Sequence, residues 1–365
     1  METFRPGHYM DFNWQMCYAS EFFDLQWFLN SKSAKAVRLL TEEYLRYKND
    51  PMNPYIVGYW ERQGIAKDYH PCDIDTAPSR RQSRHYSILR PAEPEDRPYP
   101  VVYFCHGGGQ DAFEAECYGL AERIPQDKFL YVCPNQYGPE EFRRILGEMK
   151  ENGYRLDESR IYVMGFSGGS NSAAEIALAC PELVAGAALI PGPNAFNQMP
   201  LGTVPAAFQE NERLRVPVIC IGGRCDGGDS WPLVDDTSYQ NLNHWMQYVS
   251  KAPGFRPTTL AEALARKADS PSSVEKAFGL SFDRAYINEV EDTYCYVGDY
   301  LAGDGVAIAR FCTAEGLPHG VFPVFLGVAW AFLQKFSRDP KTGALEYKVP
   351  DVDFRTWRKK KEGGE

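Results

Sequence analysis

The chain has 365 residues, of which 44% are hydrophobic and 14% aromatic, and its formal net charge is −10. A chain of this length and composition can bury a large core, so we expect a globular protein of one large domain or two. The net charge is negative and the only basic run is that at 358–365, so nucleic acid is not expected as a partner.

The first segment, residues 1–83, is rich in aromatic side chains and contains a helix-like run at 33–47, but it carries no chemical motif. We interpret it as an extension that packs on the core. Its first residues lack the basic and apolar regions of a secretory signal, and no later run approaches the roughly 20 apolar residues of a membrane span. We therefore expect a cytoplasmic protein with no membrane partner.

Strand and helix patterns alternate from residue 84 onward. Apolar strand-like runs occur at 84–91, 99–105, 128–135, 161–164, 183–192, 216–223 and 306–313. Helical patterns occur at 140–153, at 173–178 and at 321–336. Because the strands are apolar throughout and separated by helices, we predict an α/β domain over 84–340 with a mostly parallel central sheet flanked by helices. Residues 341–365 are expected to form a C-terminal tail.

The helix expected at 140–153 has an apolar face and ends at Gly153. This face consists of Phe142, Ile145, Leu146 and Met149.

The region of about 230–290 interrupts the alternation with short helices that have clear boundary signals. The run 236–249 places four apolar side chains on one face, namely Tyr239, Leu242, Met246 and Val249. Thr259 and Glu262 have the spacing of a capping box, and a further helix is expected to begin with Ser270 and Pro271 and to end at Gly279. We interpret these helices as a lid insertion.

Cysteine usage gives no sign of a metal site. The chain has ten cysteines, and Cys105, Cys133 and Cys220 lie in apolar strand-like runs. Because no C-x-x-C pair occurs, we expect free thiols rather than disulfides or a zinc site.

The stretch 160–178 places Ser167 among glycines, between a β-branched run and a helix-compatible run. The pattern G-x-S-x-G at 165–169 is typical of a nucleophile elbow, in which a serine lies on a strained strand-to-helix turn. Its neighbours must be small because the chain reverses sharply there. The pattern is short and common, however, and by itself it fits a glycine-rich turn equally well.

A serine nucleophile needs a general base, and the base needs an acid. Two histidines follow the serine: His244 lies in a helix pattern, whereas His319 lies in a Gly/Pro-punctuated turn between the last strand and the last helix. We predict His319 as the base. For the acid we prefer Asp226 to Asp229, which a turn or a helix cap explains as well. The resulting order of Ser, acid and His is that of α/β-hydrolases.

An acyl-transfer reaction also needs backbone N–H donors for the oxyanion. Gly168, directly after the serine, is expected to supply one donor. The run HGGG at 106–109 follows a strand, and we expect Gly108 or Gly109 to supply the other, although an ordinary glycine-rich turn is the alternative reading. His106 is expected to be structural because it closes a strand and precedes the serine.

The segment 156–192 resembles the central segment of the polyhydroxybutyrate depolymerase-like and feruloyl esterase-type α/β-hydrolases, the carbohydrate esterase family 1 group. In that family an Asp and then an Arg precede the strand, and a Pro ends the helix after the serine. The likeness extends over roughly 85–230 and 290–337, and it implies the same roles for the predicted nucleophile, acid, base and oxyanion donors. Family members that act on polymers are commonly secreted and often carry disulfides, which this chain does not suggest.

Together these patterns favour a serine esterase that forms an acyl-enzyme, with no metal or organic cofactor, acting on a small-molecule or oligosaccharide ester. Trp231, Tyr239 and Trp245 of the expected lid can stack on a sugar or phenolic ring, although core packing explains them equally well. One alternative is a serine peptidase of the prolyl-oligopeptidase type, which has the same triad order but usually a preceding β-propeller. Another is a non-catalytic hydrolase-fold binding protein. The oligomeric state is left open.

Overall fold

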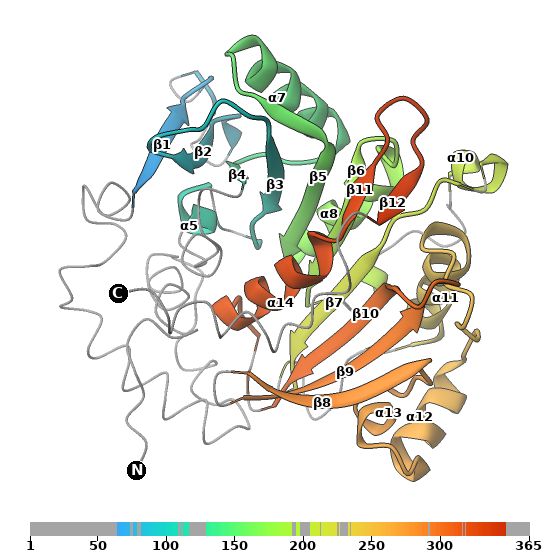
Figure 1. The fold of residues 1–365 in the computed structure, drawn as a ribbon. Helices are drawn as coiled ribbons and strands as arrows, with labels where there is room; N and C mark the ends of the chain where they lie inside the picture. Colours follow the sequence, from blue (N-terminus) through green and yellow to red (C-terminus); the bar gives the residue numbers. More distant parts are fainter. Residues whose placement is uncertain are drawn as a thin grey trace, which may run out of the picture.

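The computed structural model describes residues 64–73, 76–78, 82–108, 110, 112–116, 129–191, 195–197, 205–211, 213–224, 226, 233, 235–290, 293–315, 317 and 319–347. A ten-stranded sheet runs through the molecule, with helices packed on it and a separate two-stranded ribbon (Figure 1). Among the helices in these ranges, none is long and apolar enough to cross a membrane.

The main sheet is mostly parallel. Its strands, in chain order, are β1 (Ile65–His70), β2 (Tyr86–Pro91), β3 (Tyr99–Cys105), β4 (Leu130–Pro134), β5 (Leu156–Phe166), β6 (Val184–Ile190), β7 (Val218–Gly223), β8 (Arg284–Val290), β9 (Thr293–Leu301) and β10 (Ala307–Ala314). They lie in the order β1-β2-β4-β3-β5-β6-β7-β10-β9-β8. The six strands from β4 to β10 are parallel, while β1–β2 and β9–β8 form antiparallel borders. The predicted α/β-hydrolase fold is confirmed.

The helices follow the strands as the sequence pattern indicates. Their bounds are α5 (Ala112–Glu116), α7 (Pro139–Glu151), α8 (Gly168–Ala179), α10 (Ala206–Glu210), α11 (Asp236–His244), η3 (Trp245–Val249), α12 (Leu260–Asp269), α13 (Ser273–Phe278) and α14 (Pro323–Leu333). The four side chains of the apolar face predicted for α7 are all buried. The chain leaves α7 through Gly153, whose φ of 84° is a conformation that favours glycine.

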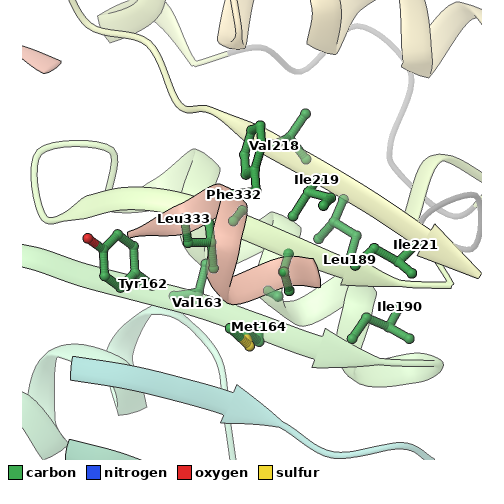
Figure 2. Packing of buried hydrophobic residues seen from close by; sticks show 14 of the residues in the cluster. Tyr162, Val163, Met164, Leu189, Ile190, Val218, Ile219, Ile221, Phe332 and Leu333 are labelled. Atoms are coloured by element: carbon green, nitrogen blue, oxygen red, sulfur yellow. The ribbon is translucent and has the colours of Figure 1, made fainter. Parts of the chain in front are cut away.

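Part of the core lies between the central strands and α14. Figure 2 shows side chains of β5, β6 and β7 converging with Phe332 and Leu333 of α14. Each of the labelled side chains in that view is fully buried. The one polar group among them is satisfied, because the hydroxyl of Tyr162 donates to the carbonyl of Phe336 at 2.7 Å. The core therefore fixes the strands whose carboxyl ends carry the candidate site.

Two domain boundaries differ from those expected. The segment assigned to an N-terminal extension, 1–83, contributes β1, which pairs with β2 along its whole length. The domain also continues past residue 340, because β11 (Phe336–Arg338) pairs with β12 (Leu345–Tyr347). Both elements belong to the folded core. Residues 1–63 and 348–365 lie outside the described part of the chain.

Buried Arg338 explains why the β11–β12 ribbon is part of the domain. Its guanidinium donates to the carbonyls of Val184, Arg215 and Gly343. These contacts join the ribbon to the start of β6 and to the segment before β7. Because a buried charge is costly unless its hydrogen bonds are satisfied, the three carbonyls make this burial tolerable.

The helix boundary signals between 235 and 280 are largely confirmed. Thr259 and Glu262 form the predicted capping box at the start of α12. Gly279 ends α13 in the left-handed conformation, as expected. The N-cap of α13, however, is Ser272 rather than Ser270, because the Ser272 hydroxyl accepts from the amide of Glu275 at 3.3 Å. The Ser270 hydroxyl instead donates to the Glu275 carboxylate at 2.7 Å.

These helices do not form the lid that the sequence suggested. The amide of Val216, just before β7, donates to the carbonyl of Val249 at 3.0 Å, so η3 lies at the amino end of that strand. The Phe278 ring of α13 packs edge-on against Phe311 in the middle of β10. In Figure 1, α11, α12 and α13 lie at the right, whereas the arrowheads of β7 and β10 point to the left. The apolar helix faces therefore cover a face of the sheet and not its carboxyl edge.

Candidate active site

Ser167 occupies a strained turn between β5 and α8. Its φ is 51° and its ψ is −119°, a conformation that residues with a Cβ rarely adopt. The amide of Ser167 donates to the carbonyl of Ile190 at 2.6 Å, which holds the turn against β6. The turn needs its glycines: a Cβ on Gly165 would lie 2.0 Å from the carbonyl oxygen of Gly169. The strand, turn and helix thus have the geometry of a nucleophile elbow.

Ser167, His319 and Asp226 form one hydrogen-bonded chain. The Oγ of Ser167 lies 3.1 Å from Nε2 of His319. Nδ1 of the same ring lies 3.0 and 3.1 Å from the two carboxylate oxygens of Asp226. With the proton on Nδ1, His319 donates to the carboxylate and Nε2 accepts from the serine hydroxyl. This is the arrangement that lets a histidine act as general base toward serine.

The sheet explains why residues so distant in sequence meet. Ser167 follows β5, Asp226 follows β7 and His319 follows β10, and all three strands run parallel. Loops after parallel strands emerge at the same edge, which is where such folds place their sites.

The loops after β7 and β10 are also joined directly. The amide of Arg224 donates to the carbonyl of Ala314 at 2.9 Å. The Arg224 guanidinium lies 2.7 Å from Glu315 and stands over the ring of Tyr296. The segments that lead to the acid and to the base are therefore held side by side.

Two backbone amides adjoin the serine. Gly168 is the first residue of α8, where amides have no acceptor within the helix. The amide nitrogen of Gly108 lies 3.6 Å from the position that a Cβ on Gly168 would occupy. The neighbouring amide of Gly107 is already bonded to Oε1 of Gln110 at 2.8 Å, so it is not available to a substrate. Gly109 lies outside the described residues. The geometry favours Gly108 and Gly168 as oxyanion donors.

His106 has the structural position that the sequence suggested. The residue is only 5% exposed, and its ring nitrogens lie 2.8 Å from the carbonyl of Gly107 and 2.9 Å from that of Asn135. Its own carbonyl accepts from the hydroxyl of Tyr137 at 2.9 Å. These bonds tie the turn after β3 to the loop after β4, and they hold the Gly108 amide in place.

Several other candidates do not face the site. Tyr239 and Trp245 are 1% and 0% exposed, so the expectation that they stack on a substrate is not supported: they belong to the core. His244 lies on α11 near Tyr248, away from Ser167. Asp229 and Trp231 lie outside the described part of the chain.

The thiol of Cys105, close to the turn, is not a competing nucleophile. Cys105 ends β3 and is fully buried, and this burial raises its pKa well above the ordinary value. It therefore stays a thiol, whereas the reactive species is the thiolate. Among the described residues, no group of three or more His, Cys, Asp and Glu side chains is arranged to hold a metal ion.

Sequence comparison finds no family model and no curated protein that match the chain. Solved structures similar to it include a thermostable esterase (18% identity, 50% of this chain and 52% of the other, TM-score 0.33). Another is an acetyl xylan esterase from Aspergillus awamori, with 13% identity, coverage of 74% of this chain and 99% of the other, and a TM-score of 0.45. A third is an S-formylglutathione hydrolase from Agrobacterium tumefaciens, with 15% identity, coverage of 51% of this chain and 83% of the other, and a TM-score of 0.37. The chain spans about half the length of the first. At these identities the likeness concerns the fold alone.

Proposed function

We propose that the chain is a serine carboxylic-ester hydrolase that works through an acyl-enzyme. The observation that carries the proposal is the hydrogen-bonded chain from Ser167 through His319 to Asp226, with the serine on a strained elbow. A glycine-rich turn without catalytic use would have no reason to hold a serine at positive φ beside a histidine and a carboxylate.

Each residue has a defined part in the first half of the reaction. Ser167 Oγ attacks the ester carbonyl carbon while its proton moves to Nε2 of His319, and Asp226 stabilises the imidazolium that forms. The carbonyl oxygen becomes an oxyanion next to the amides of Gly108 and Gly168. When the carbon–oxygen bond to the alcohol breaks, His319 returns its proton to the leaving alkoxide.

Water completes the cycle in the second half. A water molecule attacks the acyl carbon while its proton moves to Nε2 of His319. The bond from the carbon to Ser167 then breaks, and His319 gives the proton back to the serine oxygen. The acid is released and the free enzyme is restored, so atoms and charge balance without a cofactor.

The substrate class is proposed from the sequence resemblance, and it comprises phenolic esters and acylated carbohydrates. A panel of p-nitrophenyl esters from acetyl to octanoyl, run beside methyl ferulate and a p-nitroanilide, tests it. We expect ester turnover to exceed anilide turnover, and Ser167→Ala to lower kcat by on the order of 10⁶. Ser272→Ala is the matched control, because it removes only the cap of α13. Faster cleavage of the anilide would indicate a peptidase, and no turnover of any ester would exclude the proposal.

A further inference from the structure

Phe166 directly precedes the candidate nucleophile, and its ring contacts the candidate base. It ends β5 and is 6% exposed. Its ring centroid lies 5.0 Å from that of His319, with the two planes inclined by 37°. The imidazole therefore has Asp226 at one nitrogen, Ser167 at the other and the tilted ring of Phe166 beside it.

The same ring borders the oxyanion turn. A Cβ on Gly107 would lie 2.9 Å from Cδ1 and 3.1 Å from Cε1 of Phe166. Gly107 thus has no room for a side chain on the side where Phe166 lies. The Phe166 ring lies between the turn after β3 and the histidine after β10, so both pack against it.

The elbow itself does not demand an aromatic residue at this position. The steric limits fall on Gly165 and Gly169, where an added Cβ would meet backbone atoms at 2.0 and 2.2 Å. Position 166 is one of the two variable positions in the G-x-S-x-G pattern. The aromatic ring at 166 is therefore explained by its contacts rather than by the turn.

We propose that Phe166 is a positioning residue for the hydrolysis, which orients the His319 ring toward Ser167 and stabilises the positive charge that the ring acquires. The proposal rests on the proposed function, because the charge appears only when the proton of Ser167 moves to Nε2 as the Oγ–carbon bond forms. A cation within about 6 Å of an aromatic centroid is attracted by the negative face of the ring. The separation of 5.0 Å between the two ring centroids lies inside that limit.

Fluorinated phenylalanines at position 166 test the charge stabilisation, because fluorine weakens the ring quadrupole with little change in size. From mono- to trifluorophenylalanine we expect kcat for a p-nitrophenyl ester to fall stepwise, by roughly 3- to 30-fold in total, with KM nearly constant. The same series at Phe142 is the matched control. That ring belongs to α7 and is fully buried against Tyr103, and its fluorination should leave kcat unchanged.

A second variant tests the orientation without relying on activity. Phe166→Leu keeps an apolar side chain but removes the aromatic ring, so the nuclear Overhauser effects between the His319 ring protons and the Ser167 Cβ protons should weaken in its NMR spectrum. Unchanged Overhauser effects would overturn the positioning role, and a flat fluorination series in an active enzyme would overturn the charge stabilisation. A wild-type chain that hydrolyses no ester would instead refute the proposed function, while the Overhauser effects still decide whether Phe166 orients the histidine.

Discussion

Gly169→Ala should damage both the fold and the reaction, because the elbow has no space for the added methyl group. A Cβ at this position would lie 2.2 Å from the carbonyl oxygen of Cys105 and 2.3 Å from that of His106, where ordinary contacts begin at 3.4 Å. Both atoms belong to the backbone at the end of β3, a buried central strand, so neither can rotate away. Relief requires a displacement of about 1 Å of either α8 or the turn after β3.

The expected losses of stability and of kcat follow from that displacement. Forcing extra volume into a packed core costs typically ~1–3 kcal/mol, and rigid backbone on both sides places Gly169→Ala near the upper end, at about 3 kcal/mol. Movement of the turn after β3 also moves the amide of Gly108. A misplacement of about 1 Å in a catalytic group can cost roughly 10² in rate, so kcat should fall by about that factor in the molecules that remain folded.

Gly147→Ala is the matched control, because nothing lies within 4 Å of the position its Cβ would occupy. It lies inside α7, where alanine is favoured over glycine by about 0.5–1 kcal/mol. Urea unfolding followed by circular dichroism, together with kcat for a p-nitrophenyl ester, measures both effects. A Gly169→Ala enzyme with wild-type stability and kcat would refute the account of the elbow, and equal losses in both variants would show a general effect of replacing glycine.

Three further predictions concern single side chains. Arg338→Met should lower the free energy of unfolding in urea by about 3 kcal/mol or more, because three buried carbonyls lose their hydrogen-bond donor. An unchanged urea concentration at the midpoint of unfolding would contradict this. Burial lowers the pKa of His70 from 6.5 despite the nearby Asp68, so the unfolded chain binds the proton more readily. Stability should therefore fall as pH drops through about 6.5, and His70→Gln should flatten that slope. Asp226→Asn should lower kcat by roughly 10⁴, because the histidine loses the carboxylate that orients it. Asp235→Asn should leave kcat unchanged, because asparagine is also a good N-cap for α11. Equal losses of kcat in the two variants would contradict the role of Asp226 as the acid.

Local patterns were enough to predict the strands β2 to β7 and β10, the apolar face of α7, the capping box of α12 and the order of Ser167, Asp226 and His319, whereas β8 and β9 were not predicted. These features depend on residue periodicity, on steric limits within a turn, or on the order of loops after parallel strands. Each can be recognised in a short window of the sequence.

The features that the sequence did not predict depend on packing between distant parts of the chain. The lid prediction failed because a helix pattern shows which side chains are buried but not which surface buries them. Tyr239 and Trp245 were ambiguous for the same reason. The strands β1, β11 and β12 are short and only partly apolar, so they left no clear signal at the domain boundaries. Phe166 was passed over because the elbow pattern leaves its position open.

Covalent labelling shows whether Ser167 is a nucleophile that His319 activates. The wild-type chain is treated with a serine-directed phosphonate, digested and mapped by mass spectrometry, with His319→Gln treated in parallel. We expect one adduct, on Ser167, formed rapidly in the wild type and far more slowly in His319→Gln. An adduct on another serine such as Ser170, or equal labelling of both proteins, would contradict it.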